Sequence, residues 1–131
     1  IIDEKADIAT AVNSIILSKT FDNGMICASE QAVICCESIA PTVREEFQKR
    51  GGYFLQGDEY KKLGDFILTD KGVLNPAAVG QPAAKLAKLA GLENVPSSTL
   101  LLMAPLSRVG PEEKLSHEKL CPCLGFFSEK T

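Results

Sequence analysis

The residue with the clearest potential for covalent chemistry is Cys27, which lies in the segment FDNGMICASEQ, residues 21–31. Gly24 permits a tight backbone path, and an expected helix before it and strand after it leave Cys27 on a short link. A thiol on such a link can be exposed at an edge of the sheet, where ligands usually bind. The backbone N–H of Cys27 can itself contribute to an oxyanion hole for a nucleophilic thiolate. On this pattern alone, however, a small buried thiol is the simpler interpretation.

The other four cysteines indicate a reducing compartment rather than a disulfide framework. The total of five is odd, and the adjacent Cys35 and Cys36 would point to opposite faces of a strand. Cys121 and Cys123, with His117 nearby, suggest zinc, but structural zinc sites usually repeat such a cysteine pair. We therefore expect no metal site and a cytoplasmic protein. A non-enzymatic, thiol-rich domain that binds a metal or a protein partner stays open as an alternative.

Composition excludes several classes of function. The chain has 131 residues, a net charge of −3, 45% hydrophobic residues and 24% charged residues. These values are typical of a soluble globular domain and provide no basic surface for nucleic acid. The longest strongly apolar run, residues 100–104, is far shorter than the roughly 20 residues of a membrane-spanning helix. The chain begins at Ile1 without a signal segment, which suggests an internal piece of a larger protein.

The hydrophobic pattern predicts an α/β fold with helices packed on a small, mostly parallel sheet. Apolar spacing and boundary residues predict helices over 3–19, 41–49, 58–68 and 82–89. Continuous apolar runs predict strands over 32–36, 99–104 and 120–127, the last interrupted by Pro122. Because its run does not alternate, strand 32–36 is expected to be covered on both faces. Gly51 and Gly52 are expected to close a helix, so they provide no dinucleotide-binding fingerprint.

The segment around Cys27 resembles the catalytic-cysteine segment of CoA-acylating aldehyde dehydrogenases. Three further segments resemble the same family in the same order: GGYFLQG at 51–57, NPAAVGQPA at 75–83 and HEKLCP at 117–122. The match is strongest to the aldehyde dehydrogenase half of bifunctional aldehyde–alcohol dehydrogenases, and it extends over essentially the whole chain. It implies a three-layer portion of the aldehyde dehydrogenase catalytic domain, with 1–131 as a single partial domain and the cofactor-binding domain mostly outside.

The resemblance also implies chemistry. Cys27 is the expected nucleophile, and Glu118 matches the glutamate that contacts the nicotinamide-side ribose of NAD. The implied reaction interconverts acetaldehyde, CoA and NAD with acetyl-CoA and NADH through a cysteine thioester, within the fermentative metabolism of ethanol. Cys121 and Cys123 depart from the family pattern, where small polar residues are expected. A hydrolytic, non-acylating aldehyde dehydrogenase stays open as an alternative, because the glutamate that would activate water lies before Ile1.

The remaining polar residues have simpler interpretations beside functional ones. Because histidine titrates near neutral pH, His117 can shuttle a proton, but a loop histidine beside the cofactor is the simpler interpretation. Four lysines most simply form solvated helix faces, although they could attract the phosphates of CoA: Lys61, Lys62, Lys85 and Lys88. The family resemblance implies a homo-oligomeric and filamentous parent protein with no nucleic-acid or membrane partner. Without a dinucleotide fingerprint, the chain alone is expected to be inactive.

Overall fold

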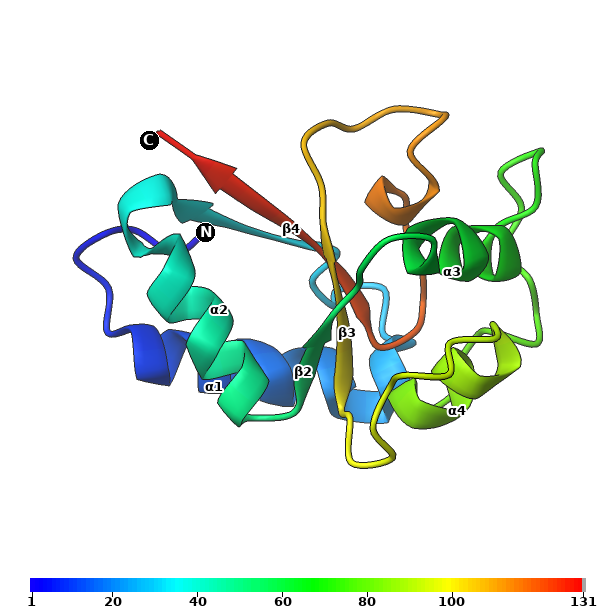
Figure 1. Cartoon of the computed structure of the whole chain (residues 1–131), viewed down its shortest axis with the longest axis horizontal. Coiled ribbons are helices and arrows are strands. Elements are labelled where there is room, and N and C mark those ends of the chain that lie inside the picture. The colour runs from blue at the N-terminus through cyan, green and yellow to red at the C-terminus, as the bar shows by residue number, and fades with distance from the viewer. Residues whose placement is uncertain (131) are drawn as a thin grey trace.

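The centre of the structure is a four-stranded sheet in which every neighbouring pair of strands is parallel. The computed structural model describes residues 1–130 and places the strands in the order β1–β4–β3–β2 (Figure 1). Their bounds are Ala32–Cys36 for β1, Gly52–Phe54 for β2, Leu101–Pro105 for β3 and Cys123–Glu129 for β4. The expected small parallel sheet is thus confirmed.

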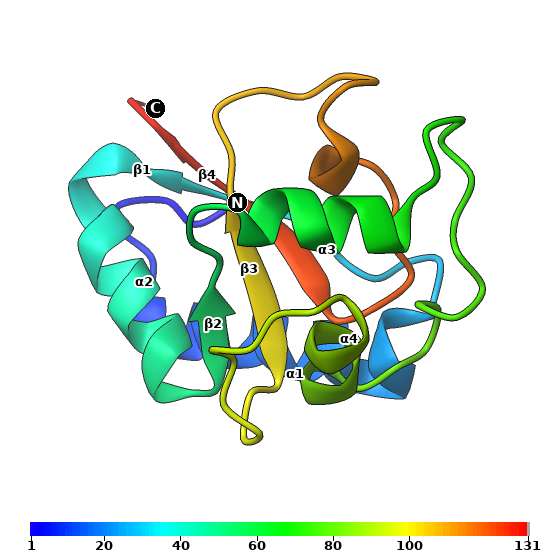
Figure 2. The ribbon, with the colours of Figure 1, turned by 45° about the vertical axis from the view of Figure 1, so that its right-hand side comes forward.

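Two layers of helices enclose this sheet, which confirms the predicted three-layer α/β architecture. The helices α1 (Ile8–Thr20) and α2 (Ala40–Lys49) lie on one face, and α3 (Glu59–Ile67) and α4 (Ala83–Leu89) lie on the other (Figure 2). Side chains along β3 alternate between the two hydrophobic cores, as a strand buried on both faces requires. Leu101 and Met103 pack with α1 and α2, whereas Leu102 and Ala104 pack with α3 and α4.

The edge strand β1 is covered on one face only, which contradicts the expectation of burial on both. Val33 and Cys35 are buried against α1 and α2, whereas Ile34 is 39% exposed on the opposite face. The physical reason is the strand order, because β1 lies farthest from β2 and its second face is not packed into the core formed with α3 and α4. Ile2 pairs with Cys35 in a single parallel bridge.

Gly51 and Gly52 both close a helix and open a strand that the sequence did not predict. Gly51 follows α2 with φ +98°, a left-handed conformation that suits glycine. Gly52 then begins β2 and pairs with Leu101 of β3. A Cβ at Gly52 would lie 2.9 Å from the carbonyl oxygen of Phe47, so the helix and strand meet too closely for a side chain. The three-residue strand has too few residues for a hydrophobic pattern.

Several predicted boundaries shift by a few residues for identifiable reasons. Helix α1 begins at Ile8 rather than near Asp3, because the Asp7 carboxylate accepts the backbone N–H of Thr10 at 3.1 Å and caps the helix. Strand β4 begins after Pro122, where no proline interrupts the hydrogen-bonded ladder. The predicted helices over 41–49, 58–68 and 82–89 agree with α2, α3 and α4 within one residue at each end.

A cluster of charges holds the approach to β4 against α3. The short helix η3 (Lys114–Ser116) supplies Lys114, whose Nζ lies 2.7 Å from Asp65 and 3.0 Å from Asp70. Hydrogen bonds from Lys114 and Lys61 lower the pKa of Asp65 to about 2. The carboxylate therefore stays charged, and keeps η3 in place, well below the pH at which aspartate is usually protonated.

We predict that Asp65→Asn removes a pH-dependent part of the stability. A lowered pKa in the folded state stabilises above the ordinary aspartate pKa, and this contribution disappears as the pH falls towards 2. Urea unfolding of the wild type and the variant should therefore differ at pH 6 and converge near pH 2. A difference that stays constant over this range would contradict the assignment.

Candidate active site

Cys27 is exposed on a sharp turn between α1 and β1. The turn follows the short helix η1 (Phe21–Gly24), in which Asp22, Asn23 and Gly24 have φ values of +51°, +52° and +77°. Aspartate, asparagine and glycine are the residues that tolerate this left-handed conformation best. The DNG sequence therefore reverses the chain at low cost and places the predicted nucleophile outside the core.

Gly24 is required at this point for a second reason, which is close packing. A Cβ at Gly24 would lie 2.7 Å from the carbonyl oxygen of Cys121, a contact that real side chains do not make. The turn that contains Cys27 thus rests directly on the backbone that leads into β4. Segments about a hundred residues apart in the sequence are in van der Waals contact here.

The backbone N–H groups at the tip of this turn are available to a ligand. Among residues 1–130, neither Cys27 nor Ala28 donates its N–H to a backbone carbonyl, whereas Ser29 donates to Ile26 at 2.9 Å. An N–H beside an exposed thiol is the arrangement that stabilises negative charge on an oxygen bound at that thiol. The structure is therefore compatible with an oxyanion role of the Cys27 N–H.

Glu118 is also exposed, on the loop between η3 and β4. His117 is half-buried beside it, and its Nε2 lies 2.9 Å from the carbonyl oxygen of Gly110. Because a carbonyl only accepts hydrogen bonds, this nitrogen must be protonated and donate. His117 therefore ties the 108–113 loop to the Glu118 segment, and the contact fits the structural interpretation of this histidine better than a proton shuttle.

Lys119 joins the two predicted site segments. Its side chain is completely buried, and its Nζ donates to the carbonyl oxygens of His117, Leu115 and Gln31 at 2.7, 2.8 and 3.2 Å. Its backbone N–H donates to Oε1 of Gln31 at 3.1 Å. Because Gln31 lies four residues after Cys27 and Lys119 follows Glu118, these bonds hold the nucleophile segment against the glutamate segment.

The ionisation state of Lys119 follows from its three bonds. Burial lowers the pKa of Lys119, but only the ammonium form has three protons to donate. Sequence reasoning assigned no role to Lys119, although it lies within the HEKLCP segment. The sequence carries no signal for this role, because the residues before Lys119 are mostly polar and no residue type identifies backbone carbonyls as partners.

The candidate site lies at the amino ends of the strands. Cys27 precedes β1 and Glu118 precedes β4, and these neighbouring strands are parallel. The exposed thiol therefore lies at an edge of the sheet, as expected, but at the amino ends of the strands rather than at the carboxyl ends, where ligands of open α/β sheets usually bind.

Three of the other four cysteines, unlike Cys27, lie in the core. Cys35, Cys121 and Cys123 are buried, and burial raises the pKa of each of these thiols. Buried thiols of this kind stay protonated and are poor nucleophiles and poor metal ligands. Among residues 1–130, no group of three or more histidine, cysteine or acidic side chains is arranged to hold a metal ion.

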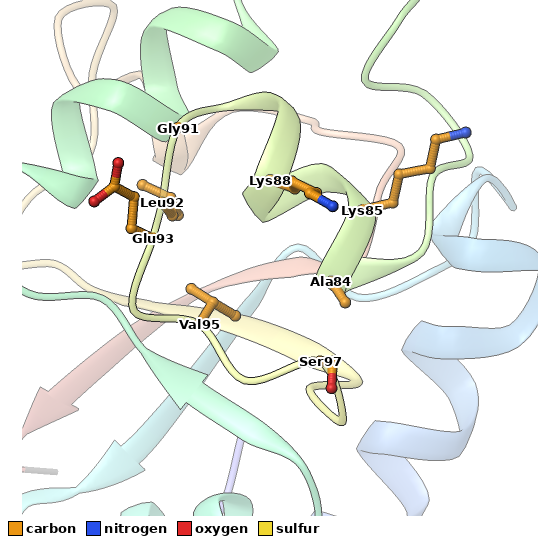
Figure 3. Close-up of a pocket in the computed structure, with 8 residues that line it drawn as sticks. All are labelled: Ala84, Lys85, Lys88, Gly91, Leu92, Glu93, Val95 and Ser97. Atoms are coloured by element: carbon orange, nitrogen blue, oxygen red, sulfur yellow. The ribbon is translucent and has the colours of Figure 1, made fainter.

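A hollow of about 770 Å³ lies between α4 and the loop that follows it (Figure 3). Lys85 and Lys88 extend from α4, and Glu93 projects from the loop. The hollow shares no lining residue with the Cys27 turn, so a role of these lysines towards CoA phosphates stays a prediction. Lys61 and Lys62 instead form ion pairs with aspartates four residues away, as expected for a solvated helix face.

No helix among residues 1–130 is long and apolar enough to cross a membrane.

Sequence comparison identifies several related proteins, although no protein-family model matches the chain. The bifunctional aldehyde–alcohol dehydrogenase of Escherichia coli is 51% identical over 99% of this chain. The aldehyde–alcohol dehydrogenase of Clostridium acetobutylicum is 49% identical over 97% of this chain. The chain spans only 14% of the length of each of these relatives.

Solved structures show the same fold. An acetylating aldehyde dehydrogenase from Geobacillus thermoglucosidasius is 46% identical, with a TM-score of 0.94 over 98% of this chain and 28% of that one. A propionaldehyde dehydrogenase from Rhodopseudomonas palustris, solved with bound CoA and an acylated cysteine, is 27% identical. Its TM-score is 0.89, over 99% of this chain and 29% of that chain.

We predict that Lys119→Met destabilises the chain. The substitution leaves the carbonyls of Leu115 and His117 without the lysine donor, at a cost of roughly 1–3 kcal/mol for each buried acceptor. Removal of the buried charge offsets part of this cost, so we expect a net loss of about 2 kcal/mol. Urea unfolding measures the loss, with the exposed Lys71→Met as the matched control. Unchanged stability would show that Lys119 does not join the two segments.

Proposed function

The chain is homologous along almost its whole length to a segment of the acylating aldehyde dehydrogenases, and we propose that it supplies the nucleophile of such an enzyme. In this proposal, residues 1–131 form part of a catalytic domain whose cofactor-binding domain lies mainly elsewhere in the polypeptide. The observation that supports it most directly is the position of Cys27. It is the one cysteine among residues 1–130 that is exposed, and it lies on a turn packed against the Glu118 segment.

The proposed reaction takes place on the sulfur of Cys27. Its thiolate attacks the carbonyl carbon of an aldehyde, which forms a C–S bond and moves an electron pair onto the oxygen. The N–H of Cys27 stabilises that negative oxygen. NAD, when bound, supplies the acceptor for the hydride that leaves this carbon, and a thioester remains on Cys27. The thiol of CoA then loses its proton to solvent and attacks the thioester, which releases acyl-CoA and regenerates the Cys27 thiolate.

Glu118 is proposed to hold the ribose of NAD. Its carboxylate is exposed, so its oxygens are open to hydroxyl donors, and a charged acceptor forms strong hydrogen bonds with hydroxyl groups. Lys119, the next residue, donates from its Nζ to the carbonyl of His117 on the other side of Glu118 and to the carbonyl of Gln31 in the nucleophile segment. Glu118 therefore has a fixed position relative to the turn that contains Cys27.

The acylating reaction is favoured over aldehyde hydrolysis and over a metal-binding role. Relatives described as acetylating, and one described with CoA and an acylated cysteine, support transfer to CoA rather than to water. Acetaldehyde as substrate, NAD as cofactor and a role in fermentation are proposed from the similarity to bifunctional aldehyde–alcohol dehydrogenases. A cytoplasmic, homo-oligomeric parent protein, filamentous as the resemblance implies, belongs to the same proposal, and the free cysteines fit a reducing compartment.

We predict that Cys27→Ala in the full-length enzyme reduces CoA-dependent NADH formation from acetaldehyde to the uncatalysed background. The substitution removes the sulfur on which the thioester forms, while the exposed position leaves the fold unaffected. Cys36→Ala is the matched control, because Cys36 is half-buried on β1 and should keep full activity. Substantial activity of Cys27→Ala would refute the proposed function.

We predict that Glu118→Gln lowers turnover or the apparent affinity for NAD by ten- to a hundredfold. A hydrogen bond to a charged acceptor contributes roughly 1.5–3 kcal/mol, and the amide removes that charge. Steady-state kinetics at varied NAD concentration measures the effect, and the melting temperature should not change. Glu112→Gln on the neighbouring exposed loop serves as the control. Equal kinetic constants for both variants would show that Glu118 is only a solvated loop residue.

A further inference from the structure

Lys19 is a buried lysine whose position the chemistry described so far does not explain. It lies in the last turn of α1 and is completely buried, although lysine is almost never fully buried without a charged partner. Among residues 1–130, no carboxylate lies within 4.0 Å of its Nζ. A helix C-terminus favours a positive charge, but that effect does not require burial.

The polar contact of Lys19 leads directly to the turn that contains Cys27. Its Nζ donates to Oγ of Ser29 at 3.3 Å, and Ser29 Oγ in turn lies 3.4 Å from the carbonyl oxygen of Gly24. Ser29 follows Cys27 by two residues and Gly24 precedes it by three. This chain of contacts therefore links both ends of the turn, with Cys27 between them.

The neighbouring residue of α1 reinforces the same attachment. Ser18 donates its hydroxyl to Glu30 Oε1 at 2.8 Å, so the last turn of α1 contacts two consecutive residues after Cys27. Burial and, after it, the nearby Lys119 ammonium lower the pKa of Lys19, and the smaller opposing effect of the Glu30 carboxylate does not offset them. The local electrostatics thus disfavours the charge of Lys19, and stability alone gives no reason for a lysine here.

The comparison with Lys119 shows what is unusual. Both lysines are completely buried, but Lys119 has three carbonyl acceptors and Lys19 has one hydroxyl partner. A buried charge with so few partners usually costs stability, and an apolar side chain of similar length is often neutral or stabilising in its place. The contribution of Lys19 should therefore appear in the geometry of the turn rather than in the free energy of unfolding.

We propose that Lys19 is a positioning residue, which holds the turn that contains Cys27 in its reactive geometry through the hydroxyl of Ser29. This inference rests on the proposed function, in which Cys27 is the nucleophile. Lys19 itself contacts no substrate atom and acts through Ser29. Displacement of a reacting group by about 1 Å can cost a hundredfold in rate, so a small shift of this turn is sufficient.

The test uses the full-length enzyme with Lys19→Met, Ser29→Ala and both substitutions together. We expect each single variant to lower kcat for acyl transfer by roughly ten- to a hundredfold. The KM for NAD and the melting temperature should stay unchanged, or the melting temperature should rise in Lys19→Met. The double variant should be no slower than the slower single variant, because both substitutions break one chain of contacts. Ser29→Thr, which keeps the hydroxyl, should retain more activity than Ser29→Ala.

Other outcomes would overturn the proposal. Full activity of both single variants would exclude a positioning role, and so would rate losses that simply multiply in the double variant. A fall in melting temperature that parallels the loss of activity would show a purely structural role. If Lys19→Met does not fold, Ser29→Ala alone decides between these outcomes. Exposed Lys71→Met is the control and should behave as wild type, whereas failure of the proposed function itself would appear as an active Cys27→Ala enzyme.

Discussion

The arrangement of the candidate site depends on one buried ammonium group. Lys119 Nζ donates to three backbone carbonyls: that of Leu115 in η3, that of His117 in the following loop and that of Gln31, which is 88 residues earlier in the chain. A carbonyl cannot move without loss of its bond, and a buried unpaired acceptor is costly. The ammonium group therefore fixes the distance between the turn that follows α1 and the loop that precedes β4. Cys27 and Glu118 inherit their relative position from this constraint.

The parallel sheet makes this constraint possible. Because β1 and β4 are parallel neighbours, the segments that enter them meet at one edge of the sheet. The carbonyl of Gln31 accepts the backbone N–H of Gly125 at 3.0 Å as well as the Lys119 ammonium. The same oxygen thus takes part in the strand ladder and in the loop network. An antiparallel pairing would place these two entry segments at opposite edges, and no lysine could join them.

The sequence was most informative where local signals act alone. Proline near the start of α2 and the spacing of its apolar residues specify that helix, and the DNG turn before Cys27 follows from conformational preference. Features that depend on distant partners could not be predicted. The exposure of Ile34 depends on which strands the helices cover, and β2 becomes a strand only because β3 pairs with it. The acceptors of Lys119 are backbone carbonyls, which no residue type identifies.

Exposure separates Cys27 from the other thiols of the chain. Burial raises the pKa of Cys121 and Cys123 within the core, and Cys27 is the one cysteine among residues 1–130 that is exposed. Cys27 is exposed because three successive residues in the left-handed conformation turn the chain outward. An exposed turn holds its sulfur in place only if it is attached to the rest of the fold. The attachment of both ends of the turn, to Lys19 on one side and to the backbone of Cys121 on the other, supplies the rigidity that exposure removes. The packing of this chain, rather than its cysteine content, therefore distinguishes Cys27, the proposed nucleophile, from the other thiols.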